Sequence, residues 1–197
     1  SILKNIYLTS FFLLLADQTL KIWIKTNMVL GQEFKILDWF IIHFTENNGM
    51  AFGLEFGGFN GKLFLTLFRI IIVTVGIYYV RSIIKKTSSK GFLIALGLII
   101  GGAIGNIIDS TFYGVLFNES YNNIAEFLPE SGGYAPLLHG KVVDMLYFPL
   151  INSHLPDWWP FFGGDHFIFF RPVFNLADSG ISIGIFIILI FYREEYN

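Results

Sequence analysis

The chain has 197 residues, of which 54% are hydrophobic and only 14% are charged, with a mean hydropathy of +0.60. A soluble domain carries about 25% charged residues, so this composition predicts a membrane protein. The formal net charge of -2 gives no indication of nucleic-acid binding, and the lack of cysteine excludes disulfides, thiolate nucleophiles and cysteine-based metal sites.

Four apolar stretches are long enough to cross a bilayer, which requires about 20 helical residues. They cover residues 5–25, 63–84, 91–110 and 174–192. In the third stretch Gly97, Gly101 and Gly105 recur at every fourth position, so this face is predicted to pack tightly on another helix.

Basic residues set the predicted orientation of these helices. The connector after the second stretch holds Arg81, Lys85, Lys86 and Lys90. Such a density of positive charge is typical of cytoplasmic loops. The connectors 27–62 and 111–173 carry few basic residues and are predicted to lie outside. Residues 1–197 are therefore predicted to form a single membrane domain with four helices and both termini in the cytoplasm.

The two external loops are predicted to contain structure of their own. In 34–46 apolar residues cluster with partial alternation, which is typical of short strands. The segment 111–139 is polar and rich in Gly and Asn, and is predicted to be an external excursion with a short amphipathic helix. Aromatic residues in 147–173 are predicted to lie at the membrane interface, namely Trp158, Trp159, Phe161 and Phe162.

Polar side chains gather at one end of the predicted bundle, although such groups are costly in a membrane. The predicted topology places all of the following in the outer leaflet or just outside it: Asp17, Lys21, Arg69, Asn106, Asp109, Asp144, Asn175 and Asp178. An ion pair across one helical turn would also account for Asp17 and Lys21. A helix cap followed by an acidic residue would account for Asn175 and Asp178.

The chemistry that the sequence offers is carboxylate chemistry. Four histidines show no ligand spacing, so no metal site and no cofactor are predicted. Two aspartates about 3 Å apart share one proton; the ionised one takes a proton from water and the protonated one polarises a carbonyl. Asp178 suits the ionised member, because a helix N-terminus favours negative charge. Asp144 suits the protonated member, beside the apolar Met145 and Leu146.

Several ordered motifs resemble those of the lipoprotein signal peptidases, the type II signal peptidases of bacteria. They are D-Q-T-L-K at 17–21, N-N-G-M-A-F-G at 47–53, G-G-A-I-G-N-I-I-D at 101–109, V-V-D at 142–144 and F-N-L-A-D-S at 174–179. Their order and spacing, together with the four-helix layout, agree with the family over nearly the whole chain. The fold class that this implies is an all-α membrane core of four transmembrane helices, with a small external β-cradle and a periplasmic insertion of helix and loop.

The resemblance implies an aspartyl endopeptidase of the bacterial cytoplasmic (inner) membrane, with its active site at the outer leaflet. Its substrates would be prolipoproteins whose lipobox cysteine carries a diacylglyceryl group, and it would cut just before that cysteine. Membrane lipids would surround it, and the peptide antibiotic globomycin would inhibit it. Asp144 and Asp178 would be the catalytic pair. The positions that would shape or support the site are Asp17, Lys21, Asn47, Gly49, Ala51, Gly105, Asn106, Asp109, Asn175 and Ala177. A loop that covers the site is expected within 34–62.

Two departures from the family pattern stand out. Ser110 follows the third-helix aspartate where the family commonly has Arg, and Arg69 or Lys141 is the candidate to replace that interaction. The segment 111–139 is a long insertion before V-V-D. Rival functions are an intramembrane protease with a G-x-G-D motif, which the chain lacks, and an ion transporter, which favours midplane polar groups and paired repeats. A lipoprotein-binding module without turnover also stays open.

Overall fold

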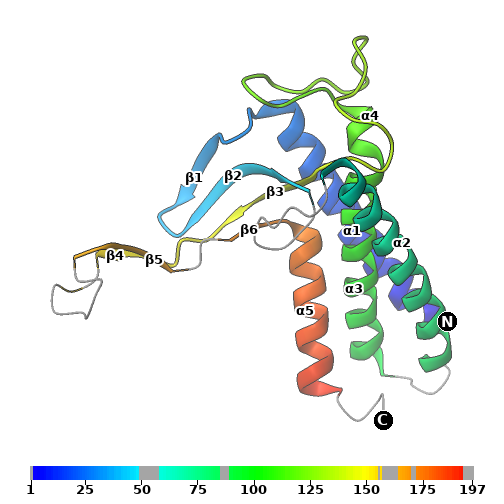
Figure 1. The fold of residues 1–197 in the computed structure, drawn as a ribbon. Coiled ribbons are helices and arrows are strands. Elements are labelled where there is room, and N and C mark those ends of the chain that lie inside the picture. Colours follow the sequence, from blue (N-terminus) through cyan, green and yellow to red (C-terminus); the bar gives the residue numbers. More distant parts are fainter. Residues whose placement is uncertain are drawn as a thin grey trace.

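The fold is that of a computed structural model, which describes residues 2–48, 58–84, 89–154, 156, 164–169 and 172–192. Long helices stand side by side, and a sheet projects sideways from one end of them (Figure 1). The helices are α1 (Ile2–Asn27), α2 (Gly58–Ile83), α3 (Lys90–Ile108) and α5 (Leu176–Phe191). The first residue of α1 and the last of α5 lie at the same end, opposite the sheet.

The glycine face of α3 packs directly on the backbone of α1, as the spacing of the glycines predicts. A Cβ atom on Gly101 would lie 2.8 Å from the Cα of Ser10, closer than real Cβ contacts allow. The Ser10 hydroxyl donates a hydrogen bond of 2.8 Å to the carbonyl of Gly97. Glycine therefore permits a close approach of the two helices that any side chain would prevent.

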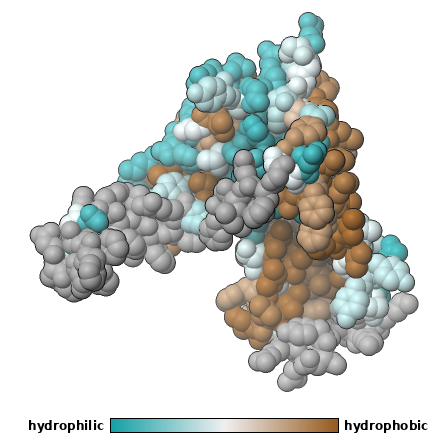
Figure 2. Space-filling model, in the orientation of Figure 1, coloured by the Kyte–Doolittle hydropathy of each residue, from teal (hydrophilic) through white to brown (hydrophobic). Residues whose placement is uncertain are grey.

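Two helical segments, Gly58–Ser82 and Lys90–Leu116, are long and apolar enough to cross a membrane by length and composition. The apolar helix α5 has 16 residues, and α1 carries four charged residues within its 26. Figure 2 shows hydrophobic residues over the helices and hydrophilic residues at the end that bears the sheet. Large apolar side chains are exposed on the helices, among them Phe11, Phe12, Phe64, Ile71, Val75, Ile183, Phe186 and Leu189.

The predicted strands within 34–46 are confirmed as an antiparallel pair, β1 (Glu33–Leu37) and β2 (Phe40–Asn47). The sheet continues through β3 (Val142–Tyr147) to β6 (Val173–Phe174), in the order β1-β2-β3-β6. A separate hairpin pairs β4 (Ile151–His154) with β5 (His166–Phe169). The register places Thr45 opposite Asp144, so the end of β2 lies beside the carboxylate on β3. The predicted interfacial aromatics at 158–162 lie outside the described residues.

The short amphipathic helix predicted within 111–139 differs from the helical residues that the structure has there. The helical residues at its start continue α3, first as a π-helical turn, Asp109–Tyr113, and then as the short α4, Gly114–Leu116. The rest of the insertion is loop, with a single bridge between Phe117 and Phe127, and it folds back over the end of α1 and α3 (Figure 1). Phe117 is fully buried in the core between the insertion and the sheet, so apolar contact rather than helix formation orders the segment.

Candidate active site

The centre of the polar cluster is a fully buried lysine on α1. Lys21 Nζ lies 2.9 Å from Asp17 Oδ2 and 2.8 Å from Asp109 Oδ2, and it donates to Asn106 Oδ1 at 3.0 Å. These three acceptors match the three protons of an ammonium group. The predicted Asp17–Lys21 pair is therefore present, but it forms one part of a network that reaches α3.

The two carboxylates paired with Lys21 each hold another element in place. Asp17 Oδ1 accepts a hydrogen bond of 2.9 Å from the backbone N–H of Ala177, in the first turn of α5. Asp109 Oδ2 accepts one of 3.2 Å from the backbone N–H of Val143 on β3. The residues beside Asp178 and Asp144 are thus anchored to the same buried ion pairs. Gly105 is part of this arrangement, because a Cβ there would lie 2.8 Å from Asp17 Oδ2.

Gln18 completes this network, and the sequence analysis missed it. Its amide nitrogen donates to Asp109 Oδ1 at 2.9 Å and to the Gly105 carbonyl at 3.2 Å, while its oxygen accepts from the Tyr113 hydroxyl at 3.0 Å. The available signal was an amide inside an apolar helix, between Asp17 and Lys21.

Asn175 joins the two predicted catalytic aspartates. Asn175 is the N-cap of α5, and its Oδ1 accepts a hydrogen bond of 2.8 Å from the backbone N–H of Asp178. This confirms the capping interpretation. The same side chain donates from Nδ2 to Asp144 Oδ1 at 2.7 Å and to Asn106 Oδ1 at 3.0 Å. Since Asn106 in turn donates to Asp178 Oδ1 at 2.7 Å, two amides tie both carboxylates into one cluster.

The surroundings of these two carboxylates differ. Asp144 on β3 is 4% exposed and also accepts a hydrogen bond from the amide of Asn47 at the end of β2. Asp178, in the first turn of α5, is half-buried. The pKa of Asp144 is raised to about 8, chiefly by burial and then by the negative charge of Asp178, against the opposing effects of Lys21 and the two amides. At neutral pH this favours a protonated Asp144 beside Asp178.

The remaining predicted positions fall in three groups. Gly49 and Ala51 lie outside the described residues. Arg69 is half-buried on α2 and attracts both Asp178 and Asp144 electrostatically. Ser110 is fully buried and accepts a hydrogen bond of 3.4 Å from Lys62. That Arg69 or Lys141 replaces the interaction of the family arginine stays a prediction.

A second buried ion pair connects the insertion to the sheet. Lys25 Nζ lies 2.6 Å from Glu46 Oε1 and 2.7 Å from the Ser120 hydroxyl, and it sits over the rings of Phe117 and Tyr134 at 5.4 and 5.0 Å. Lys141 approaches Glu46 and Glu119 at 3.7 Å. Glu46 precedes Asn47, so this cluster fixes the strand end that reaches Asp144.

This arrangement is suited to acid–base chemistry. A buried carboxyl group that keeps its proton can donate a hydrogen bond, and a more accessible carboxylate beside it can accept a proton. The buried ion pairs hold the elements that carry both groups.

Comparison with known proteins agrees with this reading. Residues 9–193 match the family described as signal peptidase (SPase) II. A lipoprotein signal peptidase of Porphyromonas gingivalis is 54% identical over 186 residues, covering 94% of this chain and 81% of that protein. One of Amoebophilus asiaticus is 41% identical over 184 residues, covering 91% and 73%. A bacterial membrane enzyme solved by the in meso method at 1.9 Å superimposes with a TM-score of 0.62 at 25% identity, covering 97% of this chain and 94% of the other.

The match extends over nearly all of the chain, including the five motifs on which the sequence resemblance rests. The chain belongs to the signal peptidase II family, and it is a protease that processes lipoproteins in a membrane.

Proposed function

We propose that the chain is an aspartyl endopeptidase that removes the signal peptide from diacylglyceryl-modified prolipoproteins, and that Asp144 and Asp178 are its catalytic pair. The observation that carries this proposal is the difference between the two carboxyl groups within one hydrogen-bonded cluster. Asp144 is buried and its pKa is raised to about 8, while Asp178 is half-buried at a helix N-terminus. Family membership supplies the reaction class, and these two groups supply the chemistry.

In the proposed mechanism Asp178 accepts a proton from a water molecule while the protonated Asp144 donates a hydrogen bond to the scissile carbonyl. The water oxygen forms a bond to the carbonyl carbon and gives a tetrahedral intermediate. Asp178 then passes the proton to the nitrogen of the cysteine that follows the cut, and the carbon–nitrogen bond breaks. Both carboxyl groups return to their starting protonation states, and no covalent enzyme intermediate forms.

We further propose four membrane-spanning helices, with α1 and α5 beside the two apolar spans and both termini in the cytoplasm of a bacterial inner membrane. The basic connector between α2 and α3 supports this orientation. The cluster would then lie at the outer leaflet, where the lipid-modified cysteine meets the aqueous phase. Membrane lipids would contact the exposed apolar faces, and globomycin would inhibit by occupying the aspartate pair.

The decisive experiment is a gel-shift cleavage assay on one prolipoprotein, with and without its diacylglyceryl group. Asp144→Asn and Asp178→Asn should each lower the cleavage rate by roughly 1,000-fold, within the range for lost acid–base catalysis. Asp38→Asn is the matched control, because Asp38 is 92% exposed in the turn between β1 and β2. Wild-type rates for either site variant, or inhibition by a chelator, would contradict the proposed mechanism.

A further inference from the structure

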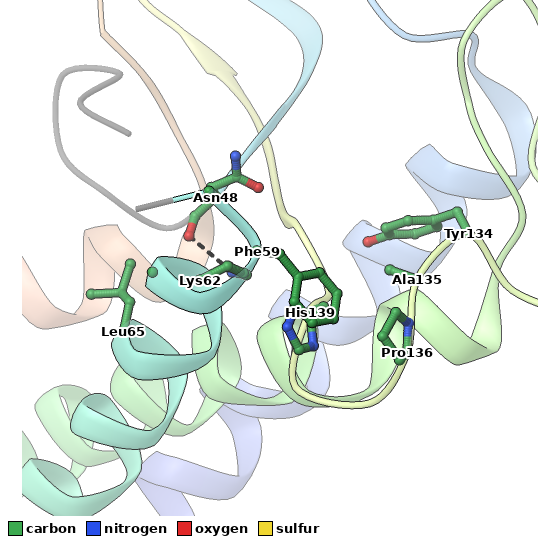
Figure 3. Close-up of a pocket in the computed structure, with 10 residues that line it drawn as sticks. Asn48, Phe59, Lys62, Leu65, Tyr134, Ala135, Pro136 and His139 are labelled. Atoms are coloured by element: carbon green, nitrogen blue, oxygen red, sulfur yellow. Dashed lines mark hydrogen bonds between the residues drawn. The ribbon is translucent and has the colours of Figure 1, made fainter. Parts of the chain in front are cut away.

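A cavity of about 340 Å³ lies beside the candidate active site, between the start of α2 and residues 134–139 of the insertion (Figure 3). Its apolar wall includes Phe59, Tyr134 and Pro136, and its polar lining consists of Asn48, Lys62 and His139. The mechanism proposed above makes no use of Lys62 or His139.

Lys62 differs from the other two lysines buried in the described part of the chain. Lys21 and Lys25 each form ion pairs with carboxylates at 2.9 Å or less. Lys62 is 8% exposed, and the partners of its ammonium group among the described residues are the Asn48 carbonyl at 2.9 Å and the Ser110 hydroxyl at 3.4 Å, both neutral. Asp109 attracts this ammonium group, but no salt bridge to Lys62 is formed by the described residues. A buried ammonium without a carboxylate in contact is costly, so a bound anion would stabilise it.

His139 presents a second polar group to the same cavity. Its ring stacks on Phe59 with the ring centroids 3.8 Å apart. Its Nδ1 lies 3.0 Å from the Leu137 carbonyl, a partner that requires the proton on Nδ1. Its Nε2 is buried without a hydrogen-bond partner among the described residues. A hydrogen bond from Nε2 to a bound carboxylate requires that this atom also carries a proton.

The cavity is directly connected to the residues around the aspartate pair. Asn48, which Lys62 holds, follows Asn47, whose amide donates to Asp144. Ser110 follows Asp109, the partner of Lys21. The insertion side of the cavity lies at the end of the bundle away from the first residue of α1 (Figure 1). If the signal peptide occupies the membrane, the residues after the lipid-modified cysteine lie at this outer end.

We propose that this cavity binds an acidic side chain within the first three residues after the lipid-modified cysteine, and that Lys62 is the specificity-determining residue. The apolar wall accommodates the methylene groups of the side chain, and Lys62 with His139 binds its carboxylate. This proposal rests on the proposed function of the aspartate pair.

The experiment compares kcat/KM for diacylglyceryl-modified substrates that carry Glu, Gln or Lys at each of these three positions. Wild-type protein should cleave a Glu substrate roughly tenfold more efficiently than the Gln substrate at one position, as expected for a charge-assisted hydrogen bond. Lys62→Gln retains a donor for the Asn48 carbonyl and should lose the preference. Lys62→Glu should prefer the Lys substrate. The control Lys35→Met removes a charge from an exposed lysine on β1 and should keep the wild-type preference.

Equal rates for Glu and Gln substrates with the wild-type protein would overturn the proposal, and so would a preference that survives in Lys62→Gln. Assays in neutral phosphatidylcholine micelles, with and without phosphatidylglycerol, test whether the bound anion is a lipid phosphate rather than the side chain of the substrate. If phosphatidylglycerol raises the rate through Lys62 while the substrate side chain has no effect, the cavity binds a lipid phosphate and the proposal is wrong. Failure to cleave any substrate would instead contradict the proposed function.

Discussion

Cleavage should depend on pH through the proton on Asp144. With a pKa of about 8, the carboxyl group is about 90% protonated at pH 7 and about 10% protonated at pH 9. If only the protonated form polarises the scissile carbonyl, kcat/KM should fall about tenfold between these two pH values, and about tenfold for each further unit. The measurement is the initial rate of the gel-shift assay at fixed ionic strength from pH 6 to pH 10.

The variant Asn47→Ala distinguishes the titration of Asp144 from a general loss of activity through damage to the protein at alkaline pH. The Asn47 amide donates to Asp144 and therefore stabilises its ionised form, which lowers the pKa. Its removal should move the alkaline limb to higher pH by up to about one unit, whatever it does to the maximal rate. The profile of Asp38→Asn should match that of the wild type. A constant kcat/KM up to pH 9.5, or a limb that moves to lower pH in Asn47→Ala, would refute the reasoning.

Three further predictions concern stability. Lys21→Met leaves two buried carboxylates without their ammonium partner and should destabilise the fold by about 3–5 kcal/mol. The measurement is thermal unfolding in detergent, and an unchanged Tm would contradict the role of this network. Gly101→Ala should cost about 1–3 kcal/mol because the new Cβ meets the backbone of α1, whereas Gly76→Ala, with open space around it, should not lower the Tm. The folded-state pKa of Asp144 is raised from 3.8 to about 8, so its contribution to stability is lost as pH rises through that interval. The Tm of Asp144→Asn relative to wild type should therefore increase with pH, and a difference independent of pH would contradict the raised pKa.

Local sequence patterns predicted much of the fold and singled out many residues of the candidate site. Glycines at every fourth position indicated the α1–α3 contact, and residue types typical of caps indicated Asn175. Charged residues in apolar stretches identified Asp17, Lys21 and Asp109, because their cost in a membrane requires a partner. These predictions depend on the spacing of residues within one helix or on the residue types along one helix face.

The missed residues depend on contacts between distant segments. Lys25 looks like an ordinary basic residue at a helix end, yet it is fully buried because the insertion brings Ser120 and Tyr134 over it. Lys62 reaches Ser110 across 48 positions in the chain. No periodicity within one segment contains this information. The insertion itself differs from the prediction because its burial comes from aromatic contacts with the sheet rather than from an amphipathic helix.

The hydrogen bonds of Asn175 have a consequence for drug resistance. One amide caps α5 through its oxygen and binds Asp144 and Asn106 through its nitrogen. A replacement side chain would need an acceptor and a donor at the same distances from the backbone, and aspartate, the side chain of the same length, would offer both only when protonated. An inhibitor that binds this amide would select substitutions that loosen the start of α5 and release Asp144 together. Escape from such an inhibitor by a single substitution at this position would therefore also remove hydrogen bonds that hold Asp144 and the start of α5.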